Sequence, residues 1–170
     1  LVIDPDFVDA HNNLGNALKE LGKLDEAVTC YNKALVIQPD FAMAHNNLGN
    51  ALRELGQLDE AVVSLRTALT IEPDHVMAHD NLGNVLMDMG RLEEAVESIH
   101  QALAINPEYD KAHGNLGLAF QHLGRLDEAV ISYHKALAIK PKNFMVLNNL
   151  GFVHEHQGKL DEAVSFYHKA

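Results

Sequence analysis

Tryptophan is absent from this 170-residue chain, aromatic residues make up only 6% of it, and cysteine occurs once, as Cys30. A single cysteine cannot form an intramolecular disulfide, so a disulfide framework is excluded. Basic residues are also scarce, with 13 lysines and arginines against 24 aspartates and glutamates and a formal net charge of −11. Affinity for nucleic acid rests largely on basic residues, so we expect neither nucleic acid nor an anionic membrane surface as a partner.

Long apolar runs are missing as well. No stretch approaches the roughly 18–20 apolar residues that would span a bilayer, and no segment has the basic-then-apolar order of a signal peptide. The sequence leaves the location open, and the cytoplasm is the expectation that fits it best. The chain opens on Leu1 instead of methionine, which indicates that the natural N-terminus lies upstream. With 47% hydrophobic residues, the length fits one domain with a sizeable core.

Proline is scarce, yet its five copies follow one fixed spacing of 34 residues. Ten of the eleven glycines obey the same period, in two series that start at Gly15 and Gly22. The prolines are Pro5, Pro39, Pro73, Pro107 and Pro141. Self-similarity at a fixed period of this length is the signature of a helical repeat architecture.

Within one period the pattern predicts a helical hairpin. Apolar residues recur at helical intervals over 8–21, and Gly22 supplies a permissive conformation that ends this first helix. Asp25 and Glu26 then mark the start of the second helix, where a cap and the helix dipole favour acidic residues. Pro39 ends the second helix because proline cannot continue one.

A glycine also lies in the middle of each predicted first helix, at position 15 and its four equivalents. Glycine inside a helix costs about 0.8–1.0 kcal/mol relative to alanine. Its presence in every repeat indicates a close crossing, in which Gly15 and Ala27 let the two helix backbones approach each other.

These residues carry a resemblance to the tetratricopeptide repeat, which covers the whole chain. The matching positions are Leu14, Gly15, Ala27, Tyr31, Ala34 and Pro39. The resemblance implies an all-α fold, an alpha-alpha superhelix (a right-handed solenoid) whose first helices line the concave face. Departures are consistent, since histidine or leucine replaces the usual aromatic residues of the first helix, and they leave the details of packing open.

We expect a single solenoid domain over residues 1–170, built from five helix-turn-helix repeats. Residues 1–7 are expected to be the tail of a preceding repeat, and the repeats to span 8–41, 42–75, 76–109, 110–143 and 144–170, the last being incomplete. Solenoids normally carry polar capping repeats, and none is apparent. The sequence therefore predicts a fragment of a longer array, whose two ends match in phase and permit end-to-end self-association.

Asparagine recurs in register along the predicted first helices, although it is a poor helix-interior residue. A complete series holds Asn13, Asn47, Asn81, Asn115 and Asn149; a second holds Asn12, Asn46 and Asn148, interrupted by Asp80 and Gly114; a third holds Asn16, Asn50 and Asn84. An amide is both donor and acceptor, so one hypothesis is a ladder that pairs with the backbone of an extended peptide. This resembles the asparagine ladder of O-linked N-acetylglucosamine transferases. The alternative is that the amides bond neighbouring helices and fix their stacking.

The residues beside this ladder bear on the kind of peptide that it would accept. Met43 and Met77 occupy one flanking position, as does Met145, and they would be soft, adaptable contacts or packing residues. Lys111 is the only cation at that position. A clamp for a peptide's C-terminal carboxylate needs several basic residues, so we do not expect one.

Eleven histidines raise the question of a metal site. One series, His11, His45, His79 and His113, lies one per repeat. Stacked helices are about 8–10 Å apart, whereas metal ligands must converge on bonds of about 2 Å, so we expect half-buried structural histidines and no metal.

No catalytic motif or cofactor-binding motif is present, and we expect no enzyme activity and no cofactor. The sequence thus predicts a protein–protein interaction scaffold that binds an extended partner segment along its concave groove. Two alternatives stay open. The chain could be the substrate-recruiting arm of a larger enzyme such as a glycosyltransferase, or a self-associating structural module.

Overall fold

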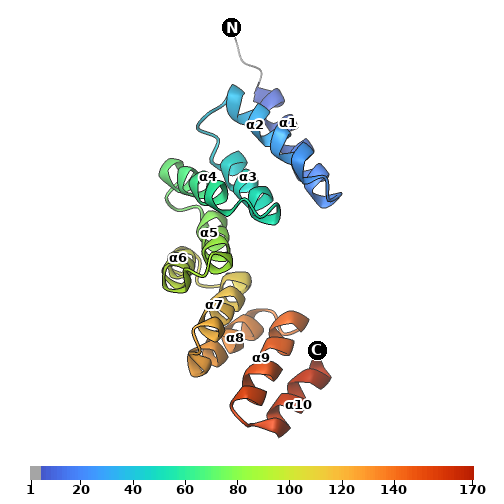
Figure 1. Ribbon diagram of the computed structural model, residues 1–170, viewed down its shortest axis with the longest axis vertical. Coiled ribbons are helices and arrows are strands. Elements are labelled where there is room, and N and C mark those ends of the chain that lie inside the picture. The colour runs from blue at the N-terminus through green and yellow to red at the C-terminus, as the bar shows by residue number, and fades with distance from the viewer. Residues whose placement is uncertain (1–4) are drawn as a thin grey trace. The chain divides into compact units, whose positions relative to one another are not determined.

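The computed structural model describes residues 5–170, which form ten α-helices joined by short turns (Figure 1). The helices are α1 (Pro5–Glu20), α2 (Leu24–Ile37), α3 (Ala42–Glu54), α4 (Leu58–Ile71), α5 (Val76–Asp88), α6 (Leu92–Ile105), α7 (Asp110–His122), α8 (Leu126–Ile139), α9 (Phe144–His156) and α10 (Leu160–Lys169). Over these described residues, no helix combines the length and the apolar character that crossing a membrane requires. The all-helical expectation is confirmed.

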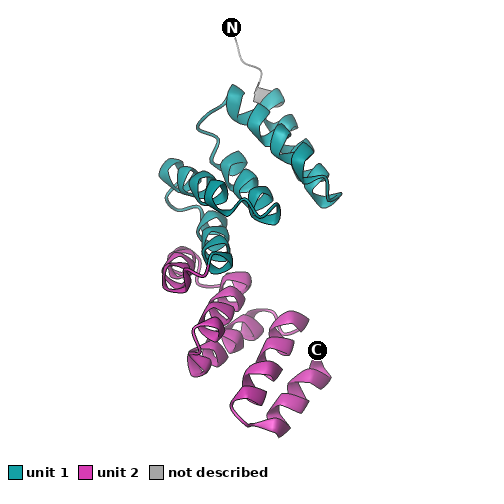
Figure 2. Ribbon diagram, viewed as in Figure 1, with its two compact units in different colours: residues 1–89 teal, residues 90–170 magenta. Residues whose placement is uncertain are grey.

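The chain divides into two compact units, residues 1–89 and 90–170 (Figure 2). In unit 1, α1 pairs with α2 and α3 with α4, while α2 packs against α3 and α4 against α5. The first helices α1, α3 and α5 are also neighbours, in that order. Small and large residues alternate in the core, which includes the fully buried Ala27, Tyr31, Ala61 and Leu65.

Unit 2 follows the same scheme. The helices α7 and α8 form one hairpin and α9 and α10 another, while α6 packs against α7, α8 against α9, and α7 lies beside α9. Ala129, Tyr133 and Ala136 of α8 are fully buried, as their equivalents in unit 1 are. Both units are therefore built from one hairpin motif.

Four of the five first helices begin where the repeat frame places them, at Ala42, Val76, Asp110 and Phe144. The first one differs, because α1 already begins at Pro5, and residues 5–7 form its opening turn instead of the tail of another helix. Proline fits the first turn of a helix because its missing N–H has no partner there anyway. The rest of the expected tail, residues 1–4, lies outside the described residues.

Each first helix ends at a glycine in the left-handed conformation, as the pattern predicted. Gly22 has a φ of 73°, and the next amide, of Lys23, donates to the carbonyl of Leu18 at 2.9 Å. This is the hydrogen-bond pattern with which helices commonly end at glycine.

The expected acidic cap of the second helix is wrong. The cap position of α2 holds Lys23, whose side chain makes no capping hydrogen bond, and Asp25 and Glu26 lie in the first turn instead. Lys23 Nζ pairs there with Glu26 Oε1 at 3.1 Å. The acidic pair still faces the positive end of the helix dipole.

The mid-helix glycine makes room for a side chain as well as for a backbone. A Cβ atom at Gly15 would lie 2.5 Å from Cε1 of Tyr31, and one at Gly117 equally close to Tyr133. At Gly49 a backbone atom, the carbonyl oxygen of Ala61, also comes close, at 3.2 Å. The close crossing is therefore shaped mainly by the large buried side chain of the second helix.

Candidate functional site

In unit 1 the three asparagine series lie on α1, α3 and α5, of which α3 is the neighbour of both others. We call the strip that their residues form the ladder face. It comprises Asn12, Asn13 and Asn16 of α1, Asn46, Asn47 and Asn50 of α3, and Asp80, Asn81 and Asn84 of α5.

Two of the series are joined by hydrogen bonds between consecutive first helices. Asn47 Nδ2 donates to Asn12 Oδ1 at 3.0 Å, and Asn81 Nδ2 donates to Asn46 Oδ1 at 2.9 Å. The acceptors are deeply buried, with Asn12 only 1% exposed. Buried polar atoms nearly always have a hydrogen-bond partner, so these amides satisfy one another across the stack, as the stacking interpretation requires.

The third series is placed differently. The amide oxygen of Asn16 accepts a hydrogen bond from the Tyr31 hydroxyl at 2.8 Å. Asn50 and Asn84 are half-buried, and within residues 5–170 neither side chain has a hydrogen-bond partner. Each therefore presents an unused amide donor and acceptor on the ladder face.

Exposed methionines and two ion pairs border the ladder face. Met43 and Met77 are about half exposed, and the sulfur of Met43 lies 3.9 Å from Nδ2 of Asn12. Lys19 Nζ pairs with Glu54 Oε1 at 3.5 Å, and Arg53 Nε with Asp88 Oδ2 at 2.5 Å. Sequence reasoning missed these pairs, although their signal was present. In each pair the basic residue precedes the acidic residue by the length of one repeat plus one residue.

The equivalent positions in unit 2 are less uniform. Asn115 and Asn149 are half-buried and Lys111 is exposed, while Leu118 and Phe152 replace the third asparagine series. Burial raises the pKa of the Tyr133 hydroxyl, and a hydrogen bond with the Asn149 side chain partly opposes this. The predicted site residues thus occupy neighbouring first helices in unit 1, some of them buried, and are interleaved with apolar residues in unit 2.

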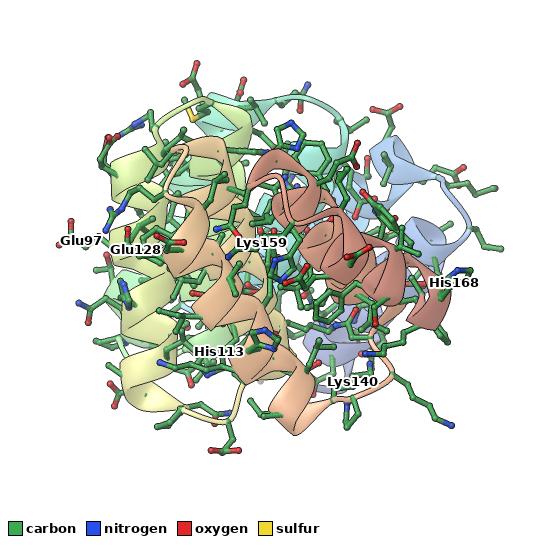
Figure 3. All side chains as sticks on the ribbon, turned by 90° about the horizontal axis from the view of Figure 1, so that it is seen from below. Glu97, His113, Glu128, Lys140, Lys159 and His168 are labelled. Atoms are coloured by element: carbon green, nitrogen blue, oxygen red, sulfur yellow. The ribbon has the colours of Figure 1, made fainter. Side chains whose placement is uncertain are left out.

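Three of the one-per-repeat histidines anchor the turns between repeats. Nε2 of His45 lies 3.0 Å from the carbonyl oxygen of Pro39, and the same contact joins His79 to Pro73 at 2.9 Å. His113, labelled in Figure 3, reaches Pro107 in the same way at 2.8 Å. In each case the ring N–H donates and the carbonyl accepts. These contacts give the histidine series a structural role that the spacing alone did not specify.

Three family models of tetratricopeptide repeats match the chain. The models described as "TPR repeat" and "Tetratricopeptide repeat" match residues 15–52 and 49–90, 81–144, and 132–165. A search of curated proteins gave no match.

Solved TPR structures have the same fold. The thermophilic TPR protein TTC0263 of Thermus thermophilus is 27% identical with a TM-score of 0.85, covering 96% of this chain and 89% of that one. MamA is 27% identical with a TM-score of 0.78 and 91% coverage of both chains. YrrB, a TPR protein with an unusual peptide-binding site, is 23% identical with a TM-score of 0.70, covering 94% of this chain and 82% of its own. The family models together span most of the chain, and with this structural likeness they show that the chain belongs to the tetratricopeptide repeat family, whose members are scaffolds for protein–protein interaction.

Proposed function

We propose that this chain binds an extended segment of a partner protein along the ladder face of unit 1. The observation that carries the proposal is the pair of unpartnered, half-buried amides of Asn50 and Asn84. A peptide backbone offers an N–H and a carbonyl at every residue, so it can satisfy both amides whatever its side chains are.

The other two series support this role indirectly. The bonds from Asn47 to Asn12 and from Asn81 to Asn46 hold the first helices in register, and this register fixes the spacing of Asn50 and Asn84. It stays a prediction that the complete series contacts a partner directly. The same holds for partner contacts of Lys111, Asn115 and Asn149 in unit 2. YrrB, which shares the fold, offers a precedent for a peptide site in the family.

The border of the ladder face suggests which segments it would prefer. The exposed side chains of Met43 and Met77 can adapt to different apolar side chains. The net charge of −11 favours a neutral or basic segment over an acidic one. We further propose that the chain itself is not an enzyme, which the membership of a scaffold family supports.

Peptides selected from a random library on the purified chain would test this proposal. Their affinity should be measured for the parent and for an Asn50→Ala, Asn84→Ala double variant. A net hydrogen bond is worth about 0.5–1.5 kcal/mol, so each lost amide should weaken binding roughly two- to twelvefold. Asn32→Ala on the exposed side of α2 is the matched control. Equal affinity of the parent and the double variant, at unchanged melting temperature, would contradict the proposal.

Self-association, which the phase of the repeats suggested, stays a prediction.

A further inference from the structure

Three rows of side chains lie on or beside the ladder face, and each row has one member on α3 and one on α5. The methionine row holds Met43 and Met77, the amide row Asn50 and Asn84, and the acid row Glu54 and Asp88. In every row the second member follows the first by the length of one repeat. Both helices lie in the middle of the chain, so the exposure of these side chains does not arise where the sequence begins or ends.

The amide row lies between the other two rows. Along α3, Asn50 follows Met43 by seven residues and precedes Glu54 by four, and α5 repeats this spacing. Residues seven or four positions apart share one side of a helix. At a rise of 1.5 Å per residue, they are separated along the helix axis by about 10 Å and about 6 Å. A peptide backbone held by the amide row therefore has apolar side chains on one side and carboxylates on the other.

The distance between the two members of a row favours one backbone conformation. The helices α3 and α5 touch through the hydrogen bond from Asn81 to Asn46, and packed helices have axes about 8–10 Å apart. A polyproline II segment has three residues per turn and a rise of about 3.1 Å per residue, so it presents the same face every ~9.3 Å. A β-strand does so every two residues, or about 6.6–6.8 Å. One turn of polyproline II therefore matches one repeat.

The hydrogen-bonding groups of the backbone favour the same conformation. An α-helical segment uses its N–H and carbonyl groups internally. A polyproline II segment has no internal hydrogen bonds, so its backbone groups are free to pair with Asn50 and Asn84.

The acid row gives the ladder face a negative border. Lys19 Nζ is shared by Glu20 and Glu54, at 3.5 Å from each. The side chain of Glu54 is 42% exposed, against 19% for Lys19. In the next pair, Asp88 is 41% exposed, against 32% for Arg53. Carboxylates therefore outnumber cations at this border and are the more exposed partners, which complements a basic side chain.

We infer that the ladder face binds a polyproline II segment with a three-residue repeat of an apolar, a basic and a third residue. The apolar residue of each turn contacts the methionine row, and the basic residue contacts the acid row. The third residue points to solvent and can be proline, whose ring fixes φ near the value of this conformation. This inference rests on the proposed function, because the amides of Asn50 and Asn84 hold the backbone. Salt screens exposed charges, so binding should weaken as salt is added.

Fluorescence anisotropy at low salt, with a labelled synthetic peptide of repeated Leu-Lys-Pro triplets, tests the inference. The peptide is about twelve residues long, which at about 3.1 Å per residue exceeds the span of three packed helices. A shuffled peptide of the same composition, in which leucine and lysine no longer recur at every third position, should bind several-fold more weakly. A Leu-Lys-Gly peptide should also bind more weakly, because a flexible segment loses more conformational freedom on binding.

Variants of the acid row test the charge preference. An Asp88→Asn, Glu54→Gln double variant should bind the Leu-Lys-Pro peptide roughly two- to thirtyfold more weakly, as expected for the loss of two exposed ion pairs. The variant should bind a Leu-Gln-Pro peptide as the parent does. Glu60→Gln with Glu97→Gln is the matched control, since it removes two exposed carboxylates of the second helices α4 and α6. Circular dichroism confirms that each variant is folded.

Several outcomes would overturn the inference. A Leu-Lys-Pro peptide that does not bind the parent, or that binds no better than the shuffled or the glycine peptide, would exclude the three-residue polyproline II repeat. Unchanged affinity of the double acid variant would exclude the basic preference. Peptides selected from a library that depend on Asn50 and Asn84 but lack the repeat would overturn this inference alone. Failure of the proposed function looks different, because the Asn50→Ala, Asn84→Ala variant would then bind every peptide as the parent does.

Discussion

The imidazole ring of His154 lies parallel to the ring of Phe166, with 5.3 Å between the ring centroids and 1° between the planes. His154 is buried between α9 and α10, and within the described residues its Nδ1 atom has no hydrogen-bond partner. His134 of α8 approaches the same phenylalanine, with 6.0 Å between centroids. The last hairpin is thus closed over a buried imidazole ring.

We expect this contact to make unit 2 less stable in mild acid. Burial, and then the nearby Lys159, hold the pKa of His154 below its usual value; Glu162 opposes this and His134 adds to it. As the pH falls below about 6.5, the ordinary histidine pKa, the unfolded chain takes up a proton that the folded one refuses, so the free energy of unfolding decreases. The loss levels off below the lowered pKa.

Urea unfolding at about pH 8 and about pH 5, on either side of the histidine pKa, measures this effect. His154→Leu, which introduces the residue found at the equivalent positions 18, 52 and 86, should lose less stability in acid than the parent. His122→Leu, at an exposed position, should behave like the parent. If the free energy of unfolding decreased equally in acid for the parent and for His154→Leu, the assignment of this effect to His154 would be refuted.

At alkaline pH, ionisation of the Tyr31 hydroxyl should destabilise unit 1. Burial, and next the carboxylate of Glu54, raise the pKa of its hydroxyl to about 12. Between about pH 10, where an unfolded tyrosine ionises, and about pH 12, the unfolded chain releases a proton that the folded chain retains, so stability falls. Tyr31→Phe should be less sensitive over this interval, even though it loses the bond to Asn16. If the free energy of unfolding fell equally with rising pH in both proteins over this interval, the effect could not be assigned to Tyr31.

The hydrogen bond between Asn47 and Asn12 should be measurable as a coupling free energy between the two side chains. Asn47→Ala leaves the buried oxygen of Asn12 without its partner, which costs about 1–3 kcal/mol. In a double-mutant cycle with Asn12→Ala, the two changes should be non-additive by about 0.5–1.5 kcal/mol. Asn50→Ala, which removes no described bond, should change stability by less than about 0.5 kcal/mol. Strict additivity of the first pair would mean that the bond contributes nothing.

Two glycines of α7 offer a matched comparison. A Cβ atom at Gly117 would lie 2.5 Å from the buried ring of Tyr133, so Gly117→Ala should destabilise unit 2 by about 1–3 kcal/mol. At Gly114 the nearest atom, Cγ2 of Val146, is 3.3 Å away. There the gain in helix propensity of about 0.8–1.0 kcal/mol should roughly offset a small adjustment. Thermal melting of both variants checks the ranking, and equal losses would disprove it.

The fold was largely predictable because glycine and proline mark helix ends locally, and the repeats show the same marks five times. The arrangement of the site was less predictable. Periodicity shows that Asn47 and Asn50 recur, but their partners depend on how each helix is rotated against its neighbours. The bond from Asn47 to Asn12 and the lack of a described partner for Asn50 follow from that rotation. The packing of Tyr31 against Gly15 is a tertiary contact of the same kind.

Each rung of the amide ladder joins residues 35 positions apart, which is one repeat plus one residue. The turn anchors are shorter still, since His45 follows Pro39 by six positions. Contacts this local can form without closing long loops, and chains rich in them fold fast. A repeat needs only its immediate neighbours to become ordered. During synthesis, therefore, each hairpin can fold onto the one before it as soon as it has emerged from the ribosome.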